Sequence, residues 1–335
     1  MLFSLNINSI RDVLKRRGSR AIALQDIPMY VQEQTGLHAM TMSTDLLAGA
    51  KRDTLTRIRE NGDRVGCACL LLSETDPLSL GDPRQKIGED AVIRMTKVVE
   101  AASLLGCNSA SLEINAKDTD EAMELVATRI RRVLERADRL EIMVLIRPSK
   151  GLTQDAERLT ELVKAIGGFR IGTMPDFESA VASGDPVQYL KKLTPYASVV
   201  NASTLAFKDP EPVAVEPGGK AEAESPEPET ADEPADKTAS DTPSEPGESG
   251  TEAGEIAGMT PEEAILAAIE AELDALDEVE APEHVGYDLT PLIGAIRAVG
   301  FDGTVAIDYR GKDDGTVGVL QSKDALEAAL EMSAD

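Results

Sequence analysis

The chain has 335 residues, of which 42% are hydrophobic and only 3% aromatic, so a sizeable core must be built from aliphatic side chains. The formal net charge of −26 argues against binding to nucleic acid or to an anionic membrane surface, because both need clustered lysine and arginine. No apolar stretch approaches the length of about 18 residues that spans a membrane, and no secretory signal is visible. We therefore expect a cytoplasmic protein.

Short apolar runs alternate with longer amphipathic segments along the chain. The runs predict eight strands buried on both faces, at residues 2–7, 37–42, 65–72, 109–114, 141–146, 169–173, 197–201 and 304–309. The segments between them predict helices at residues 24–35, 51–64, 90–105, 119–137, 154–166, 186–193, 289–299 and 323–332. Eight such alternations favour an α/β fold of the (β/α)₈ TIM barrel type over an open, doubly wound sheet.

The alternation is interrupted once, between the seventh strand and the seventh helix. Residues 209–258 contain 15 acidic and 2 basic residues and almost no large apolar ones, which gives a net charge of −13. Such a segment cannot bury enough apolar surface to offset the entropy lost on ordering. We therefore predict a long disordered acidic insertion in a barrel formed by residues 1–208 and 286–335.

An amphipathic helix is predicted at residues 259–281, after the acidic stretch. Thr260 and Pro261 are typical of a helix start, and an apolar stripe follows at Leu266, Ile269, Leu273 and Leu276. The stripe either docks on the barrel or binds a protein partner or a second copy of the chain, using residues 259–280. The insertion leaves from the carboxyl-terminal rim, where the active sites of barrels lie.

The cysteines and histidines offer little chemistry. Cys67, Cys69 and Cys107 are expected to be buried, reduced core thiols, because no matching cysteine or histidine completes a metal or disulfide pattern. His38 begins the second strand, at the end of the barrel away from catalysis, and His284 lies at the exit of the insertion. Both histidines are expected to be structural or solvated.

Four segments carry a resemblance to a known family. Residues 23–28 (ALQDIP) and 100–107 (EAASLLGC) resemble a first helix and a helix end, residues 172–177 (GTMPDF) resemble a G-T-L-P-D-F motif, and residues 299–311 resemble a terminal G-Y-x-G-x-L-x-I-E-Y-x-G motif. Together they resemble the sugar phosphate isomerase/epimerase family, the xylose isomerase-like barrels. The resemblance covers residues 1–208 and 286–335.

The resemblance implies a divalent metal, Mn²⁺ or Mg²⁺, at the carboxyl-terminal mouth. The family's ligands are a Glu, an Asp, a His and a Glu, and these positions fall on Arg147, Asp176, Asn201 and Asp308 in this sequence. The metal would polarise sugar oxygens while paired carboxylates move a proton. Asp176 and Asp308 are therefore the expected catalytic residues and the expected metal ligands, although an arginine beside them would repel a cation.

Other polar residues at strand ends are candidates for substrate binding. Glu113 and Asn115 at the end of the fourth strand either bind substrate hydroxyls or form a solvated pair on the rim. Arg147, placed beside Asp176 and Asp308, either forms a structural ion pair with them or clamps a carboxylate or phosphate. Asn201 completes the predicted set of substrate-binding residues.

Two functions follow from these residues. One is a sugar phosphate isomerase/epimerase-like enzyme that acts on or binds a small sugar or polyol derivative at the rim. The other is a non-catalytic barrel, a pseudoenzyme, that binds an anionic ligand through Arg147 or recruits a partner through its insertion. Endonucleases that share this barrel use several histidines and a basic surface, and this chain has neither.

Overall fold

The computed structural model describes residues 1–15, 21–208 and 281–333. The sheet contains eight parallel strands in the order β6-β5-β4-β3-β2-β1-β10-β7. These strands are β1 (Leu2–Asn6), β2 (Ala39–Ser43), β3 (Ala68–Ser73), β4 (Ser109–Glu113), β5 (Met143–Arg147), β6 (Ile171–Thr173), β7 (Val199–Thr204) and β10 (Thr304–Tyr309). The predicted TIM barrel and all eight predicted strands are confirmed.

The two outer strands of this order, β6 and β7, close the barrel. Parallel bridges join Thr173 to Ala197 and Asp176 to Asn201, and the Asn201 amide donates to the Pro175 carbonyl at 2.8 Å. Two residues of the predicted site, Asp176 and Asn201, therefore lie at the seam of the barrel and face each other across it.

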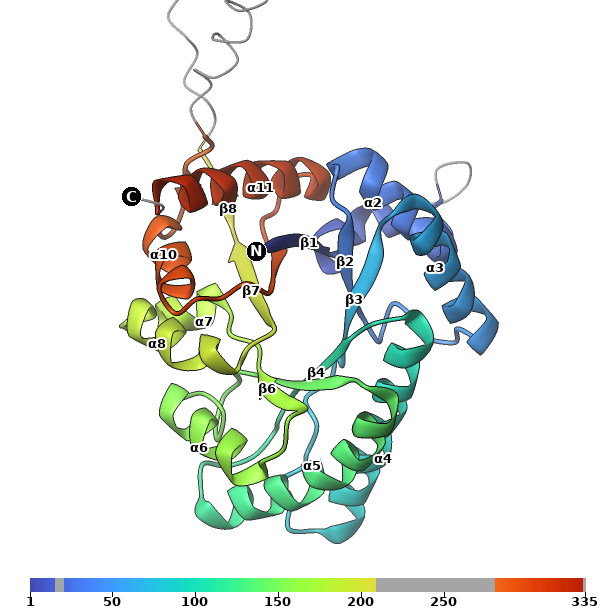
Figure 1. Ribbon diagram of the computed structural model, residues 1–335, viewed down its shortest axis with the longest axis vertical. Helices are drawn as coiled ribbons and strands as arrows, with labels where there is room; N and C mark the ends of the chain where they lie inside the picture. Colours follow the sequence, from blue (N-terminus) through green and yellow to red (C-terminus); the bar gives the residue numbers. More distant parts are fainter. Residues whose placement is uncertain (16–20, 209–280, 334–335) are drawn as a thin grey trace, which may run out of the picture. The chain divides into compact units, whose positions relative to one another are not determined.

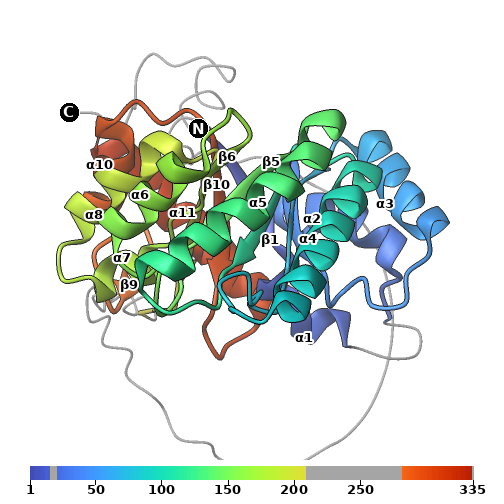
Figure 2. The same ribbon diagram turned by 90° about the horizontal axis from the view of Figure 1, so that it is seen from below.

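Helices surround the strands (Figure 1). They are α1 (Arg11–Leu14), α2 (Ile27–Thr35), α3 (Arg52–Val65), α4 (Gln85–Leu105), α5 (Asp120–Leu140), α6 (Ala156–Ile166), α7 (Phe177–Ala182), α8 (Pro186–Leu193), α10 (Thr290–Ala298) and α11 (Gly315–Met332). Figure 2 shows α4, α5 and α6 along one side of the barrel. Each of the eight predicted helices overlaps one of these helices, whereas α1 and α7 were not predicted.

The core has two parts, as expected for a barrel that is filled rather than hollow. The larger part lies between the strands and the outer helices and is mainly aliphatic. The smaller part fills the barrel interior with Leu71, Leu145, Met174, Val199 and Ala306. This interior layer lies beneath the mouth of the barrel.

The last helix, α11, begins at Gly315 and not at residue 323 as predicted. Asp314 caps it by accepting hydrogen bonds from the amides of Thr316 and Val317. The sequence signal was weak because glycine disfavours helix interiors. A Cβ at Gly315 would lie 2.1 Å from the Ser9 carbonyl oxygen, so the glycine allows the helix start to approach the first βα connection.

A two-stranded hairpin stands where the chain leaves and re-enters the barrel. Strand β8 (Ala206–Phe207) pairs antiparallel with β9 (His284–Val285). His284 Nε2 accepts a hydrogen bond from the Leu205 amide at 2.9 Å, and its Nδ1 lies 2.8 Å from the Tyr287 carbonyl oxygen. The predicted structural role of His284 is confirmed. Residues 209–280 lie outside the described part of the chain, so the predicted acidic disorder and the helix at 259–281 stay predictions.

Acidification is expected to loosen this hairpin. Burial lowers the pKa of His284 below the ordinary value of 6.5, so the folded state favours the neutral ring. The contribution of His284 is therefore complete above pH 6.5 and is lost as the pH falls through the lower folded pKa. Protonation of Nε2 removes the acceptor for the Leu205 amide. Amide hydrogen exchange of Leu205, corrected for its intrinsic pH dependence, should accelerate between pH 7 and pH 5 relative to that of core amides.

A His284→Gln variant serves as the control, because glutamine retains an acceptor but does not titrate near neutral pH. Its Leu205 exchange should show no additional acceleration in that range. Equal acceleration in both proteins would show that His284 does not hold the hairpin.

The remaining histidine and the cysteines agree with the sequence analysis. His38 is exposed at the start of β2, with Nδ1 3.2 Å from the Gly66 carbonyl oxygen. Cys67, Cys69 and Cys107 are free and buried, and burial raises the pKa of Cys67 to about 12. Burial also raises the pKa of Cys107, so the thiols of Cys67 and Cys107 stay protonated in the core. Within the described ranges, no helix is both long and apolar enough to cross a membrane.

Candidate functional site

A cavity of about 600 Å³ opens at the carboxyl-terminal mouth of the barrel. Its polar and charged lining comes from the ends of several strands and the loops that follow them, and includes Asn6, Asn8, Arg11, Ser73, Glu113, Arg147, Asp176, Asn201, Asp308, Arg310 and Lys312. The sequence-predicted residues Glu113, Arg147, Asp176, Asn201 and Asp308 are therefore brought together in one place. Their catalytic and binding roles stay predictions.

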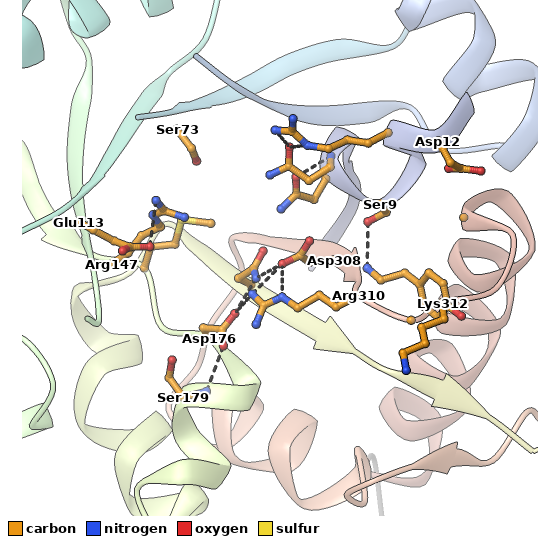
Figure 3. Close-up of a pocket in the computed structure, with 18 of the residues that line it drawn as sticks. Ser9, Asp12, Ser73, Glu113, Arg147, Asp176, Ser179, Asp308, Arg310 and Lys312 are labelled. Carbon is orange, nitrogen blue, oxygen red and sulfur yellow. Dashed lines mark hydrogen bonds and ion pairs between the residues drawn. The ribbon is translucent and has the colours of Figure 1, made fainter. Parts of the chain in front are cut away.

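Arg310 lies at the centre of an ion-pair cluster on one side of this cavity (Figure 3). Its Nη2 is 2.6 Å from Asp176 Oδ2 and 2.7 Å from Asp308 Oδ2, and its Nε donates to Asp308 Oδ2 at 2.9 Å. Its Nη1 contacts the Glu178 carboxylate. One guanidinium thus joins three carboxylates: Asp176 follows β6, Glu178 lies in α7, and Asp308 lies near the end of β10.

The two aspartates of the cluster are largely shielded from water, whereas Arg310 and Glu178 reach the surface. The side chains of Asp176 and Asp308 are 13% and 8% exposed, and that of Arg310 is 36% exposed. Burial by itself would lower the pKa of Arg310, but the charges of Asp176 and Asp308 outweigh this effect and raise it above the ordinary arginine value. The guanidinium is therefore permanently charged.

Asn201 holds the two aspartates together from the other side. Its Nδ2 donates to Asp176 Oδ2 at 2.7 Å and to Asp308 Oδ2 at 2.8 Å. Carboxylates only accept hydrogen bonds, so the amide nitrogen, and not the oxygen, must face them. Asn201 Oδ1 is buried and has no hydrogen-bond partner among the described residues.

The local backbone explains why Arg310 occupies this position. Side chains alternate along a strand, so Arg310 follows Asp308 on the same face, with Tyr309 between them on the other. The Arg310 amide donates to the Thr204 carbonyl at 2.8 Å, which continues the pairing of β10 with β7. The sequence analysis missed Arg310 as a site residue, although this two-residue spacing was a signal that could have identified it.

The structure corrects the predicted partner of Arg147. Its Nη2 lies 3.1 Å from Glu113 Oε1 and donates to the Glu74 carbonyl oxygen at 3.0 Å. The ion pair of Arg147 with Asp176 and Asp308, one of the two roles predicted for this arginine, is wrong, because Arg310 occupies that position. Strands β4 and β5 are neighbours, and Glu113 lies directly opposite Arg147. The Glu113 carboxylate is therefore nearer to Arg147 than the two aspartates are. Figure 3 shows this pair apart from the Arg310 cluster.

Asn115 does not line the cavity. It is exposed, and its Nδ2 donates to Ser79 Oγ at 3.3 Å. Glu113 and Asn115 therefore do not act as a pair at the mouth. The sequence analysis also missed Arg11 and Lys312, which line the cavity from the first βα connection and the loop after β10.

The fold is that of a TIM barrel with a polar cavity at its carboxyl-terminal mouth. Residues 30–335 match the family model of xylose isomerase-like TIM barrels. The chain belongs to this family, which confirms the family expected from the sequence motifs. A search of curated proteins gave no match.

Solved structures of similar fold include an epimerase, a zinc-binding protein and a probable dehydratase. L-ribulose 3-epimerase is 9% identical with a TM-score of 0.67, covering 100% of this chain and 96% of that chain. The IOLI protein with a bound zinc atom is 11% identical with a TM-score of 0.61, covering 99% and 98%. The probable 3-DHS dehydratase AsbF from Bacillus anthracis is 15% identical with a TM-score of 0.56, covering 96% and 98%. At these identities the likeness establishes the fold alone.

The residues as arranged do not fit the divalent metal that the resemblance implies. The position of one expected carboxylate is held by Arg147, which is cationic. Asp176 Oδ2 and Asp308 Oδ2 both receive hydrogen bonds from Asn201 and from Arg310. Within the described ranges no group of three His, Cys, Asp or Glu side chains is placed to hold a metal ion.

Proposed function

We propose that the chain binds a small sugar or polyol derivative in the mouth cavity. The volume of about 600 Å³ lies in the usual range for small-molecule sites. The lining offers both acceptors and donors, which suits hydroxyl groups because a hydroxyl both donates and accepts. The family and the epimerases of similar fold point to the same class of ligand.

One observation supports the proposal most directly: Asp308 keeps one free carboxylate oxygen at the cavity. All hydrogen bonds that Asp308 receives from described residues go to Oδ2, and none goes to Oδ1. Asp308 lines the cavity, so Oδ1 is the acceptor we assign to a ligand hydroxyl. Arg310 and Asn201 fix its orientation.

Asp176 has a different role in this proposal. Its Oδ1 accepts from the Ser179 amide at 3.0 Å, and its Oδ2 accepts from Asn201 and Arg310. With both oxygens engaged, Asp176 is a positioning residue. Asp308 is the carboxylate that would carry a proton in an isomerisation or epimerisation, because it alone of the two has a free oxygen.

One observation favours the non-catalytic alternative. Both aspartates are engaged with Arg310, so only one carboxylate oxygen of the two is free. Acid–base chemistry commonly uses a pair of carboxylates. An anion clamp through Arg147 is less favoured, because Glu113 already balances its charge. Partner binding through residues 259–280 concerns a segment outside the described residues and stays a prediction.

Saturation-transfer NMR and calorimetry with a panel of aldoses, ketoses, polyols and sugar phosphates would test the proposal. At least one compound is expected to bind the wild type, and Asp308→Asn should weaken it by about 10-fold to 100-fold, because a hydrogen bond to a charged group contributes about 1.5–3 kcal/mol. Asn115→Ala, outside the cavity, should leave the affinity unchanged. If no compound in the panel binds, or if Asp308→Asn binds as tightly as the wild type, the proposal fails.

The same samples in D₂O distinguish enzyme from binder. Deuterium entering a carbon-bound position of the bound sugar in the wild type, and not in Asp308→Asn, indicates isomerase or epimerase chemistry. Binding without exchange indicates the non-catalytic barrel.

A further inference from the structure

We infer that the guanidinium of Arg310 occupies, as a built-in cation, the place among Asp176, Asp308 and Glu178 where a divalent metal ion would bind. The chain would then hold no metal ion at its mouth. This inference does not depend on the ligand, and it holds whether or not the cavity binds a sugar.

The partners of Arg310 are all carboxylates. Asp176 and Asp308 both contact its Nη2 and Glu178 contacts its Nη1, and carboxylate oxygens are the donors that hard divalent cations prefer. Asp176 and Asp308 are both largely buried, and buried carboxylates require a cation or a full set of donors. Arg310 meets this need with contacts of 2.6, 2.7 and 2.9 Å to the two aspartates.

The orientation of Asn201 also favours a guanidinium over a metal ion at this place. A metal ion would attract the amide oxygen, because only the oxygen is a ligand. Here the amide nitrogen lies between Asp176 and Asp308, while the buried oxygen lacks a partner. This arrangement complements a guanidinium that shares the carboxylates, and it is the opposite of what an ion at the same place would select.

Arg310 is also fixed in place by the backbone of the barrel. Its amide is paired to Thr204 at 2.8 Å, so its backbone continues the β7–β10 pairing. Its Nε, Nη1 and Nη2 each contact a carboxylate, so the guanidinium is held along its whole edge. Displacing it would break contacts with three carboxylates at once, and a metal ion in solution would have to replace all of them.

The test is a Mn²⁺ titration of the full-length protein by calorimetry and electron paramagnetic resonance. The acidic residues 209–258 attract cations in every variant, so each titration is compared with that of the same protein carrying Asp176→Asn. For the wild type we expect no Mn²⁺ site that Asp176→Asn removes. For Arg310→Ala we expect one additional site, at least about tenfold tighter than the background, that Asp176→Asn does remove.

Two further variants keep the test decisive. Arg310→Lys retains the charge and should show no additional site, whereas Arg310→Gln retains an amide donor without the charge and should gain one even if Arg310→Ala fails to fold. The inference is overturned if the wild type binds one Mn²⁺ that Asp176→Asn abolishes. It is equally overturned if folded Arg310→Ala or Arg310→Gln gains no site.

Discussion

Arg310→Ala is expected to lower the free energy of unfolding of the barrel by about 3–5 kcal/mol at neutral pH, the cost commonly found when a buried charge loses its partner. The substitution leaves Asp176 and Asp308 close together and largely buried, without the cation that balances them. Urea denaturation followed by circular dichroism would measure the loss in the absence of divalent ions.

Arg147→Ala is the matched control for this loss. Arg147 contacts one carboxylate, that of Glu113 at 3.1 Å, and the Glu113 side chain is 30% exposed. Its charge stays partly hydrated without the arginine, so we expect a loss of only about 1 kcal/mol. A double variant, Arg310→Ala with Asp308→Asn, should recover part of the stability, because it removes one of the unpaired charges. Equal losses for Arg310→Ala and Arg147→Ala would show that the cluster does not stabilise the barrel more than this partly exposed pair.

The architecture could be predicted because the barrel strands are buried on both faces. Runs such as residues 141–146 and 304–309 are almost continuously apolar, which marks a strand whatever it packs against. In the structure β10 covers residues 304–309, and β5 begins two residues later and ends one residue later than its run. The helices that were not predicted are short, since α1 has four residues and α7 has six. The start of α11 was missed where Gly315 and Gly318 weaken the helical signal. Local contacts stabilise such elements, and hydrophobic periodicity does not reveal them.

The candidate site could be predicted as a place but not as a set of contacts. The resemblance assigned Asp176, Asn201 and Asp308 to the mouth, and the structure brings them within hydrogen-bonding distance. The resemblance could not show whether Arg147 or Arg310 would form ion pairs with the two aspartates. Arginine has a long, flexible side chain, so its position at the end of a strand leaves its partner undetermined.

The seam between β6 and β7 leads to a second large effect, which is carried by an apolar residue. Phe177 is fully buried, begins α7 and directly follows Asp176, the residue that caps that helix. Phe177→Ala is expected to lower the free energy of unfolding by about 3–5 kcal/mol, since it removes buried apolar surface and leaves a cavity. In a domain of this size such a loss lowers the melting temperature by about 10 °C, which differential scanning calorimetry would measure.

The effect of Phe177→Ala should also reach the site, because the ring anchors the helix start to which Asp176 is bonded. Ser179 donates its amide to Asp176 Oδ1 at 3.0 Å, so movement of the first turn of α7 would shift the carboxylate that Arg310 and Asn201 share. The Asn201 side-chain amide protons should therefore change chemical shift and exchange faster with solvent. Phe177→Leu keeps most of the apolar volume and should cost about 1–2 kcal/mol with the amide signals nearly unchanged. A large loss of stability in Phe177→Ala with unchanged Asn201 signals would mean that Arg310 and Asn201, and not the packing of α7, hold Asp176 in place.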